Sequence, residues 1–207
     1  RRIRLESPWP GIEAAFRPEL RANYRRRRKR LEALGSLQLT AVNEPQALHQ
    51  HLADCLALEQ AGWKGAHGTA MLDSPGTTRF YQKLAFRLAA RGQLRIFCLR
   101  LNQRLIAFEY CCLDPHTRRL YSLKIAYDET LRACSPGSVL RWLLLQHAHA
   151  AGFASYEMLG EDAHWKADWS GERLELHHLR VYNRTLRGRL WWWRAQAGAA
   201  ALDRGEG

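Results

Sequence analysis

The chain has 207 residues, 46% hydrophobic and 25% charged, a balance typical of a globular domain that excludes wholesale disorder. It carries 32 Lys and Arg against 20 Asp and Glu, a formal net charge of +12, so its surface should attract nucleic acid, anionic lipid or a phosphate-rich cofactor. Apolar runs such as Trp142–Leu145 are far shorter than the ~20 residues that cross a bilayer, and no signal-peptide pattern opens the chain. We therefore expect a cytoplasmic protein without a membrane span.

The cysteines are odd in number and lie in segments that read as helix or strand interiors. They show neither a CxxC pair nor the Cys and His spacing of a zinc site. We therefore predict reduced core residues and no metal. The five are Cys55, Cys98, Cys111, Cys112 and Cys134.

The N-terminal segment, residues 1–35, is irregular and then very basic. It starts at Arg1 without an initiator Met, and Pro8 and Pro10 precede any periodic element, which suggests a fragment that lacks a preceding domain. Arg17–Leu34 reads as a helix rich in arginine with a thin apolar side. We favour a solvated connector helix, and a phosphate-binding helix is the alternative.

Residues 36–183 read as one α/β domain with a mixed, mostly antiparallel twisted sheet flanked by helices. A basic, Trp-rich helix, Arg187–Leu202, then leads to a frayed tail within residues 184–207, and it should cover a sheet edge or dock on a partner domain. Periodicity and turn signals predict the elements of the domain. The strands are Leu37–Val42, Leu94–Leu101, Leu105–Leu113, Leu120–Tyr127, Phe153–Leu159 and Leu174–Tyr182, and the helices are Pro45 to about Ala61, Thr77–Ala90 and Ser138–Ala151.

Between the first two helices of the domain lies a Gly-studded loop, Gly62–Gly68. It is too irregular to be core. It carries Trp63 and Lys64, side chains that a loop acting only as a connection would not need. We predict that these two side chains face a substrate. The alternative is that Trp63 plugs the edge of the core.

The turn Arg132–Gly137 joins a predicted strand to the long apolar helix Ser138–Ala151. The first N–H groups of such a helix attract anions, and Gly137 lets a ligand approach the backbone. Ser135 could cap the helix, and Pro136 suits its first turn. The turn is therefore a candidate phosphate site, with an ordinary capped helix as the alternative.

The turn reads Arg-x-x-Ser-x-Gly and resembles the Arg/Gln-x-x-Gly-x-Gly/Ala pyrophosphate loop of GNAT acetyltransferases, with Ser135 in place of the first Gly. Across Arg17–Tyr182 the order of short motifs is similar to the GNAT-like acetyltransferases that include a bacterial cellulose-biosynthesis protein. Those motifs are Trp63-Lys64-Gly65, Phe80-Tyr81, Gly92, Tyr121–Asp128, Ser135-Pro136-Gly137, Leu159-Gly160 and Trp165-Lys166. Longer members have two GNAT-like halves, and this chain looks like the second.

The resemblance implies a GNAT fold that uses acetyl-CoA or another acyl-CoA as co-substrate. The thioester would lie where the strands Tyr121–Tyr127 and Phe153–Leu159 splay apart. The pantetheine arm would bond to backbone near Ile125 and Ala126. The pyrophosphate would sit on the N–H groups of Ser135, Gly137, Ser138 and Val139, with Arg132 and Arg141 adding positive charge.

Acyl transfer needs a base for the attacking group and a donor for the oxyanion that forms. Glu109 could be the base if it faces the cleft, and otherwise it is a solvated, outward-facing carboxylate. Tyr127 and Asp128 end the strand nearest the expected thioester. Lys166 matches the lysine position of the related Fem-type aminoacyl transferases, where a lysine can stabilise negative charge, and its alternative is a surface lysine.

Three functions fit these patterns. The first is an N- or O-acyltransferase that moves an acyl group from acyl-CoA to a small or sugar-like acceptor, as in polysaccharide biosynthesis. The second is a Fem-like transferase that uses aminoacyl-tRNA, for which the basic helix would be the electrostatic footprint. The third is a non-catalytic half that binds a polyanion or an upstream GNAT half.

Overall fold

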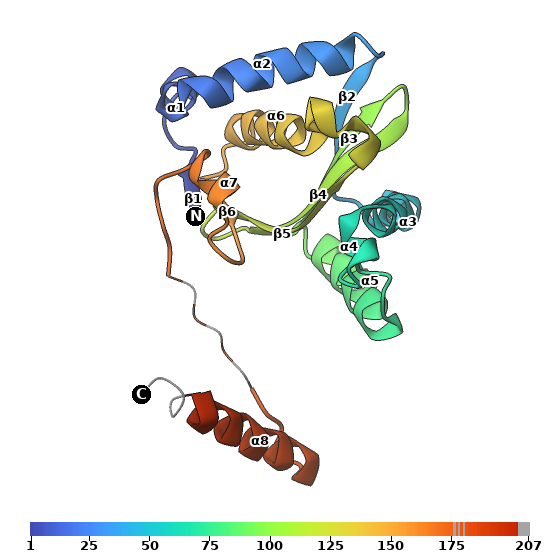
Figure 1. The fold of residues 1–207 in the computed structure, drawn as a ribbon, viewed down its shortest axis with the longest axis vertical. Helices are drawn as coiled ribbons and strands as arrows, with labels where there is room; N and C mark the ends of the chain where they lie inside the picture. Colours follow the sequence, from blue (N-terminus) through green and yellow to red (C-terminus); the bar gives the residue numbers. More distant parts are fainter. Residues whose placement is uncertain (176, 178, 180, 203–207) are drawn as a thin grey trace. The chain divides into compact units, whose positions relative to one another are not determined.

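The structure is a computed structural model, and it describes residues 1–175, 177, 179 and 181–202 (Figure 1). The chain divides into two compact units, Arg1–Arg173 and Leu174–Gly207. The second unit carries helix α8 (Leu186–Leu202). The first carries β1 (Arg2–Arg4), α1 (Trp9–Ala15), α2 (Pro18–Glu32), β2 (Leu37–Val42), α3 (Pro45–Ala61), α4 (Trp63–Ala66), α5 (Pro75–Ala90), β3 (Leu94–Leu101), β4 (Arg104–Asp114), β5 (Arg119–Tyr127), the 3₁₀ helix η1 (Glu129–Cys134), α6 (Pro136–Ala150), β6 (Ser155–Met158) and α7 (His164–Ala167).

One six-stranded sheet organises the first unit, with the strand order β1-β6-β5-β4-β3-β2. Every neighbouring pair is antiparallel except β5 with β6, which is parallel. Helices α1, α2 and α6 cover one face, and α3 and α5 cover the other (Figure 1). Because both faces are covered, the central strands β3 and β4 are buried along most of their length, as their continuous apolar runs require.

The predicted fold class is confirmed, and most predicted elements appear within a residue or two of their expected ends. β2, α3 and β3 have the predicted bounds. The predicted loop Gly62–Gly68 contains one helical turn, α4, and the segment after β6 contains another, α7. All five cysteines are free, and Cys55, Cys98 and Cys111 are buried, as expected for reduced core residues.

The predicted strand Leu174–Tyr182 is wrong for the residues that the structure describes in this range, which have no regular structure; residues 176, 178 and 180 lie outside the description. The place beside β6 is taken by β1, in the segment predicted to be irregular. Alternation in the sequence indicated a strand, but a strand needs a neighbour to pair with. Helix α8 agrees with the predicted C-terminal helix, and residues 203–207 of the predicted frayed tail are not described.

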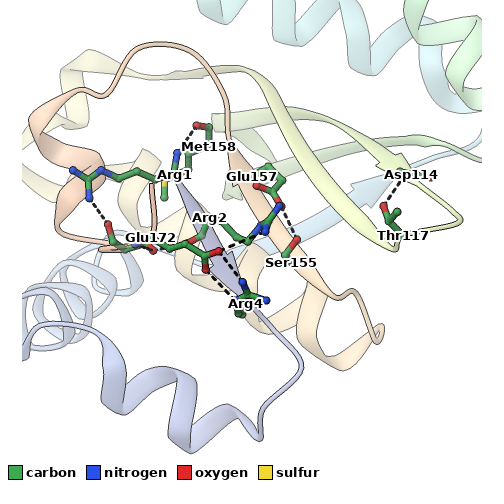
Figure 2. Close-up of polar contacts among 10 residues, drawn as sticks. Arg1, Arg2, Arg4, Asp114, Thr117, Ser155, Glu157, Met158 and Glu172 are labelled. Carbon is green, nitrogen blue, oxygen red and sulfur yellow. Dashed lines mark hydrogen bonds and ion pairs between the residues drawn. The ribbon is translucent and has the colours of Figure 1, made fainter. Parts of the chain in front are cut away.

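Ion pairs fasten β1 to the sheet (Figure 2). Arg2 donates to the buried carboxylate of Glu157 on β6 at 2.6 Å, and Ser155 donates to the same carboxylate at 2.7 Å. Arg4 pairs with Glu172 at 2.8 Å, so the segment after α7 lies against the other side of β1. The N-terminal strand and this segment therefore complete the edge of the sheet beside β6.

The parallel pairing between β5 and β6 is short. It runs from Arg119 opposite Ser155 to Ser122 opposite Met158, and β6 ends there. β5 continues to Tyr127, still paired with β4 on its other side. Within the described part of the chain, residues 123–127 of β5 therefore have no strand along one edge, and this is the splay that the resemblance implied.

An aromatic stack holds helix α2 beside this splay. Tyr24 of α2 stacks on Trp142 of α6 with ring centroids 4.3 Å apart and planes 9° from parallel. Leu20 and Leu31 are buried on the same side of α2. The helix is therefore packed on the domain along its thin apolar side, while arginines such as Arg25 stay exposed.

The turn into α6 has an unusual backbone. Ser135 precedes the helix with φ +44° and ψ +63°, the left-handed region that glycine favours. Its side chain makes no cap hydrogen bond to the helix, so the predicted Ser135 cap is wrong, because a left-handed residue points its hydroxyl elsewhere. The hydroxyl lies 3.4 Å from the carbonyl of Arg132. Pro136 begins the helix, as predicted.

We predict that Ser135→Gly raises the thermal midpoint, because it relieves the left-handed strain of a Cβ-bearing residue. The relief is about 1 kcal/mol after the added flexibility of glycine in the unfolded chain is subtracted. For a domain of this size, that free energy corresponds to ~2–4 °C in thermal unfolding. Ser135→Ala is the matched control, since alanine keeps the strain and should leave the midpoint unchanged. An equal rise in both variants would contradict this reading of the turn.

Candidate active site

A cavity of about 670 Å³ opens where the splay of β5, the start of α6 and helix α2 meet. The end of α3 with α4, and the segment of α7, close its other sides. The cavity is large enough for a cofactor-sized ligand. It is therefore the candidate active site.

Most residues that the sequence predicted for a cofactor come together in the cavity wall. Ile125, Ala126, Ser135, Gly137, Ser138 and Arg141 all line it. Gly137 lies close to the end of β5, because a Cβ at this position would meet the ring of Tyr127 at 3.4 Å. A bulkier residue than glycine would therefore fill the space between the strand end and the helix start.

The backbone donors at the start of α6 are fewer than predicted. The N–H of Ser135 donates to Arg132, and the N–H groups of Ser138 and Val139 both donate to the Ser135 carbonyl. Val139 is fully buried, and neither it nor Arg132 lines the cavity. The N–H of Gly137 has no backbone acceptor among the described residues. The helix dipole and the Gly137 N–H are thus the anion-attracting features left at this end.

Arg141 brings a buried positive charge to the wall. Its Nε donates to the Tyr156 hydroxyl at 3.1 Å, and its Nη2 lies 3.7 Å from the carboxylate of Glu109. The guanidinium also lies over the ring of Trp165, 4.5 Å from its centroid. These three contacts hold the Arg141 guanidinium in place, and Arg141 lines the cavity.

Glu109 does not line the cavity. Its side chain is fully buried, it accepts a hydrogen bond from the Tyr156 hydroxyl, and it lies behind Arg141. The alternative of an outward-facing, solvated Glu109 is therefore wrong. The sequence shows Glu109 as an isolated carboxylate in an apolar strand, but it does not show that Arg141 lies beside Glu109 in the fold.

Lys166 and Asp128 lie near the cavity but do not line it. The ammonium of Lys166 donates to the carbonyls of Leu159 and Glu161 at 2.7 and 2.6 Å, so the surface-lysine alternative is wrong. Burial lowers the pKa of Lys166, and the nearby Arg141 lowers it further. Asp128 caps η1 and pairs with Arg104 at 2.5 Å. Both side chains hold loops in place.

Tyr127, Trp63 and Lys64 do line the cavity. Trp63 is 52% exposed, so it does not plug the core, and its backbone N–H donates to Glu129 of η1 at 2.7 Å. Lys64 donates to the backbone carbonyl of Ile125 at 2.5 Å, on the splayed part of β5. The predicted substrate-facing loop and the predicted cofactor strand therefore meet in one cavity.

Glu59 also lines this cavity, although no sequence pattern singled it out. Its carboxylate is fully buried and accepts hydrogen bonds from Lys64 at 2.9 Å and from the N–H of Met71 at 2.7 Å. Glu59 lies four residues after Cys55 and seven after Leu52, so it continues the buried stripe of α3. A carboxylate on an otherwise apolar stripe was the signal that could have found it.

The described residues hold no cluster of three or more His, Cys, Asp or Glu side chains that could bind a metal ion.

Most cationic side chains of the cavity wall are paired with carboxylates. Arg17 pairs with Asp168 at 3.0 Å across the mouth between α2 and α7. Arg27, which also lines the cavity, has no ion pair within the described part of the chain.

Comparison with solved structures shows the same fold in several proteins. An aminoglycoside acetyltransferase from an uncultured soil metagenomic sample, solved with sisomicin, matches with 10% identity and a TM-score of 0.53, over 74% of this chain and 99% of that one. FemX matches with 10% identity and a TM-score of 0.56, over 81% of this chain and 56% of that one.

The C-terminal domain of a putative lysylphosphatidylglycerol synthetase from Agrobacterium fabrum is a third match, with 17% identity and a TM-score of 0.48, over 75% of this chain. This chain spans 43% of the length of that one.

No curated protein matches the sequence significantly. A family model does match it, and it covers residues 18–167, from α2 through α7. That range contains every wall residue discussed above except Arg17 and Asp168, and the family is described as an acetyltransferase (GNAT) domain. The chain therefore belongs to the GNAT acetyltransferase domain family.

Proposed function

We propose that this protein transfers an acetyl or other acyl group from acyl-CoA to an amine or hydroxyl of a small or sugar-like acceptor. The observation that carries the proposal is the cavity that joins the unpaired edge of β5 to the start of α6. A cytoplasmic site of action, where acyl-CoA is available, is part of the proposal.

The cavity suits the two ends of such a donor. An extended pantetheine arm carries amides that can bond to backbone groups of residues 123–127 on this edge, where the Ile125 carbonyl also accepts a hydrogen bond from Lys64. The pyrophosphate would meet the start of α6, where the Gly137 N–H and the helix dipole favour an anion. Arg27 and Arg141 line the wall and add positive charge.

Acyl transfer at this position would form a bond from the acceptor nitrogen or oxygen to the acyl carbon and break the bond from that carbon to sulfur. The departing thiolate needs a proton. Tyr127 ends β5, lines the cavity and could supply that proton from its hydroxyl, which then takes up the proton that the acceptor nitrogen or oxygen loses on acylation. Glu109, Asp128 and Lys166 do not line the cavity, so in this proposal they support the site without touching the substrate.

Two half-exposed indoles support a sugar-like acceptor. Trp63 and Trp165 line the cavity with 52% and 43% of their surface exposed. Aromatic faces of this kind pack well against the apolar faces of sugar rings. The acetyltransferase of similar fold that was solved with sisomicin is consistent with such an acceptor. The cellulose-biosynthesis relationship remains an expectation from the sequence resemblance.

We predict that saturating acetyl-CoA raises the thermal midpoint of the protein. At a ligand concentration of 100 times the Kd, binding adds about 2.7 kcal/mol, or about 5–10 °C for a chain of this length. Gly137→Asp should remove most of this rise, because its carboxylate would repel the pyrophosphate at the helix start while remaining compatible with the helix.

Gly137→Asn is the matched control, since it has nearly the same shape and no charge. The asparagine variant should keep more of the acetyl-CoA shift than the aspartate variant, measured by differential scanning fluorimetry. No shift in the wild type with acetyl-CoA or with longer acyl-CoA thioesters would count against the proposed function.

A Fem-like reaction with aminoacyl-tRNA is the second candidate, and the arginines of α2 favour it. Arg25 is exposed, and Arg17 and Arg27 of the same segment line the cavity. If this alternative holds, tRNA binds with an affinity that falls by roughly 10³ or more between 50 and 200 mM salt. Replacing Arg25, Arg26 and Arg30 by Gln should then weaken binding, measured by filter retention. Indifference to tRNA at low salt would end this alternative.

A further inference from the structure

We infer that Lys64 is a catalytic residue that donates a hydrogen bond to the oxyanion formed on the acyl group. The inference rests on the proposed function, since it takes the thioester to lie in the splay of β5. It assigns the charge-stabilising role to a different lysine from Lys166, the position that the sequence resemblance indicated.

Two hydrogen bonds fix the ammonium of Lys64 in the cavity and leave one N–H donor for a ligand. A lysine ammonium has three N–H donors. In Lys64 one donates to the Glu59 carboxylate at 2.9 Å, and a second donates to the Ile125 carbonyl at 2.5 Å. The third has no acceptor among the residues that the structure describes, and it can meet a ligand because Lys64 lines the cavity beside the splayed edge of β5.

The neighbouring lysines do not have this geometry. Lys166 donates to two loop carbonyls and does not line the cavity. Lys124 precedes Ile125 on β5, but its ammonium lies over the ring of Tyr81, 5.2 Å from the centroid, and it does not line the cavity either. Among these three ammonium groups, Lys64 alone combines a cavity position with a contact to the splayed strand.

Glu59 is the positioning residue for Lys64. Its carboxylate is fully buried and is itself held by the Met71 N–H at 2.7 Å, so it cannot swing away with the lysine. The backbone between them is also tight, because a Cβ on Gly65 would lie 1.9 Å from the carbonyl oxygen of Gln60. The sharp α3 to α4 turn therefore aims Lys64 back at β5.

In the reaction, the lone pair of the acceptor forms a bond to the acyl carbon, and the π electrons of the thioester carbonyl move to its oxygen. The free N–H of Lys64 would stabilise that oxyanion by a charge-assisted hydrogen bond. When the oxyanion collapses, the carbon to sulfur bond breaks and the thiolate leaves. The acceptor nitrogen or oxygen gives up one proton and the thiolate takes up one by way of Tyr127, so Lys64 keeps its own protons and the step needs no other co-reactant.

The inference can be tested by isotope-edited infrared spectroscopy of bound [1-¹³C]acetyl-CoA. A hydrogen bond from an ammonium should move the thioester carbonyl band of the wild-type complex below its position in water. Lys64→Met should return the band toward the water value. Lys83→Met is the matched control, because it removes an exposed lysine of α5 that does not line the cavity, and the shifted band should persist.

Turnover gives a second readout. Thioester consumption, followed by chromatography of released CoA with water or an amine as acceptor, should fall by about 10²–10³ in Lys64→Met, the usual loss of one oxyanion donor, with little change in KM for acetyl-CoA. Lys83→Met should remain within a few-fold of the wild type.

Lys64→Met leaves the Glu59 carboxylate buried without its main partner, so this variant could unfold. The double variant Glu59→Gln with Lys64→Met removes both charges and keeps the test valid in a folded protein. A bound wild-type complex whose carbonyl band is unshifted, or is unchanged by either variant, would overturn the inference and leave the proposed function standing. Failure of the wild type to bind any acyl-CoA would overturn the proposed function itself.

Discussion

The site depends on where the parallel ladder between β5 and β6 stops. Four residue pairs join the two strands, and β5 then runs on through residues 123–127 with one edge unpaired. Backbone groups on such an edge need partners, and an extended ligand can supply them. Because α6 begins just after the same strand, the unpaired edge and the helix start face one cavity.

The other walls of the cavity are formed by helices that pack beside the splayed strand. The stack of Tyr24 on Trp142 fixes α2 against α6, which turns a very basic segment into a wall. On the opposite side, Glu59 and Lys64 tie α3 and α4 to the splayed strand. One aromatic contact therefore holds the wall on one face of the sheet, and one buried ion pair holds the wall on the other face.

Much of the fold could be predicted from the sequence because periodicity reports which residues are buried. β2, α3 and β3 were predicted with their observed bounds for that reason. The strand predicted at Leu174–Tyr182 was wrong because pairing is a long-range property, and β1 takes the place beside β6. No local pattern in the short segment Arg2–Arg4 announced that it pairs with β6.

The candidate site was predictable only in part, because a sequence gives residue types without their directions. Gly137 and Ser138, to which the turn before α6 drew attention, line the cavity, since backbone position follows from element order. Glu109 was chosen as an isolated carboxylate and Lys166 from the resemblance to Fem-type transferases, and both side chains bond to other groups without lining the cavity. Glu59 lies among the apolar residues of α3, and its pairing with Lys64 becomes evident only in the three-dimensional structure.

The central claim is that acyl-CoA binds between the end of β5 and the start of α6. Hydrogen–deuterium exchange, measured by mass spectrometry with and without CoA, tests it most directly. The account predicts slower exchange with CoA in peptides that cover residues 123–127 and 136–141, because the ligand would occupy the free edge and the helix start. CoA-dependent protection confined to other parts of the chain, or none at saturating CoA, would contradict it.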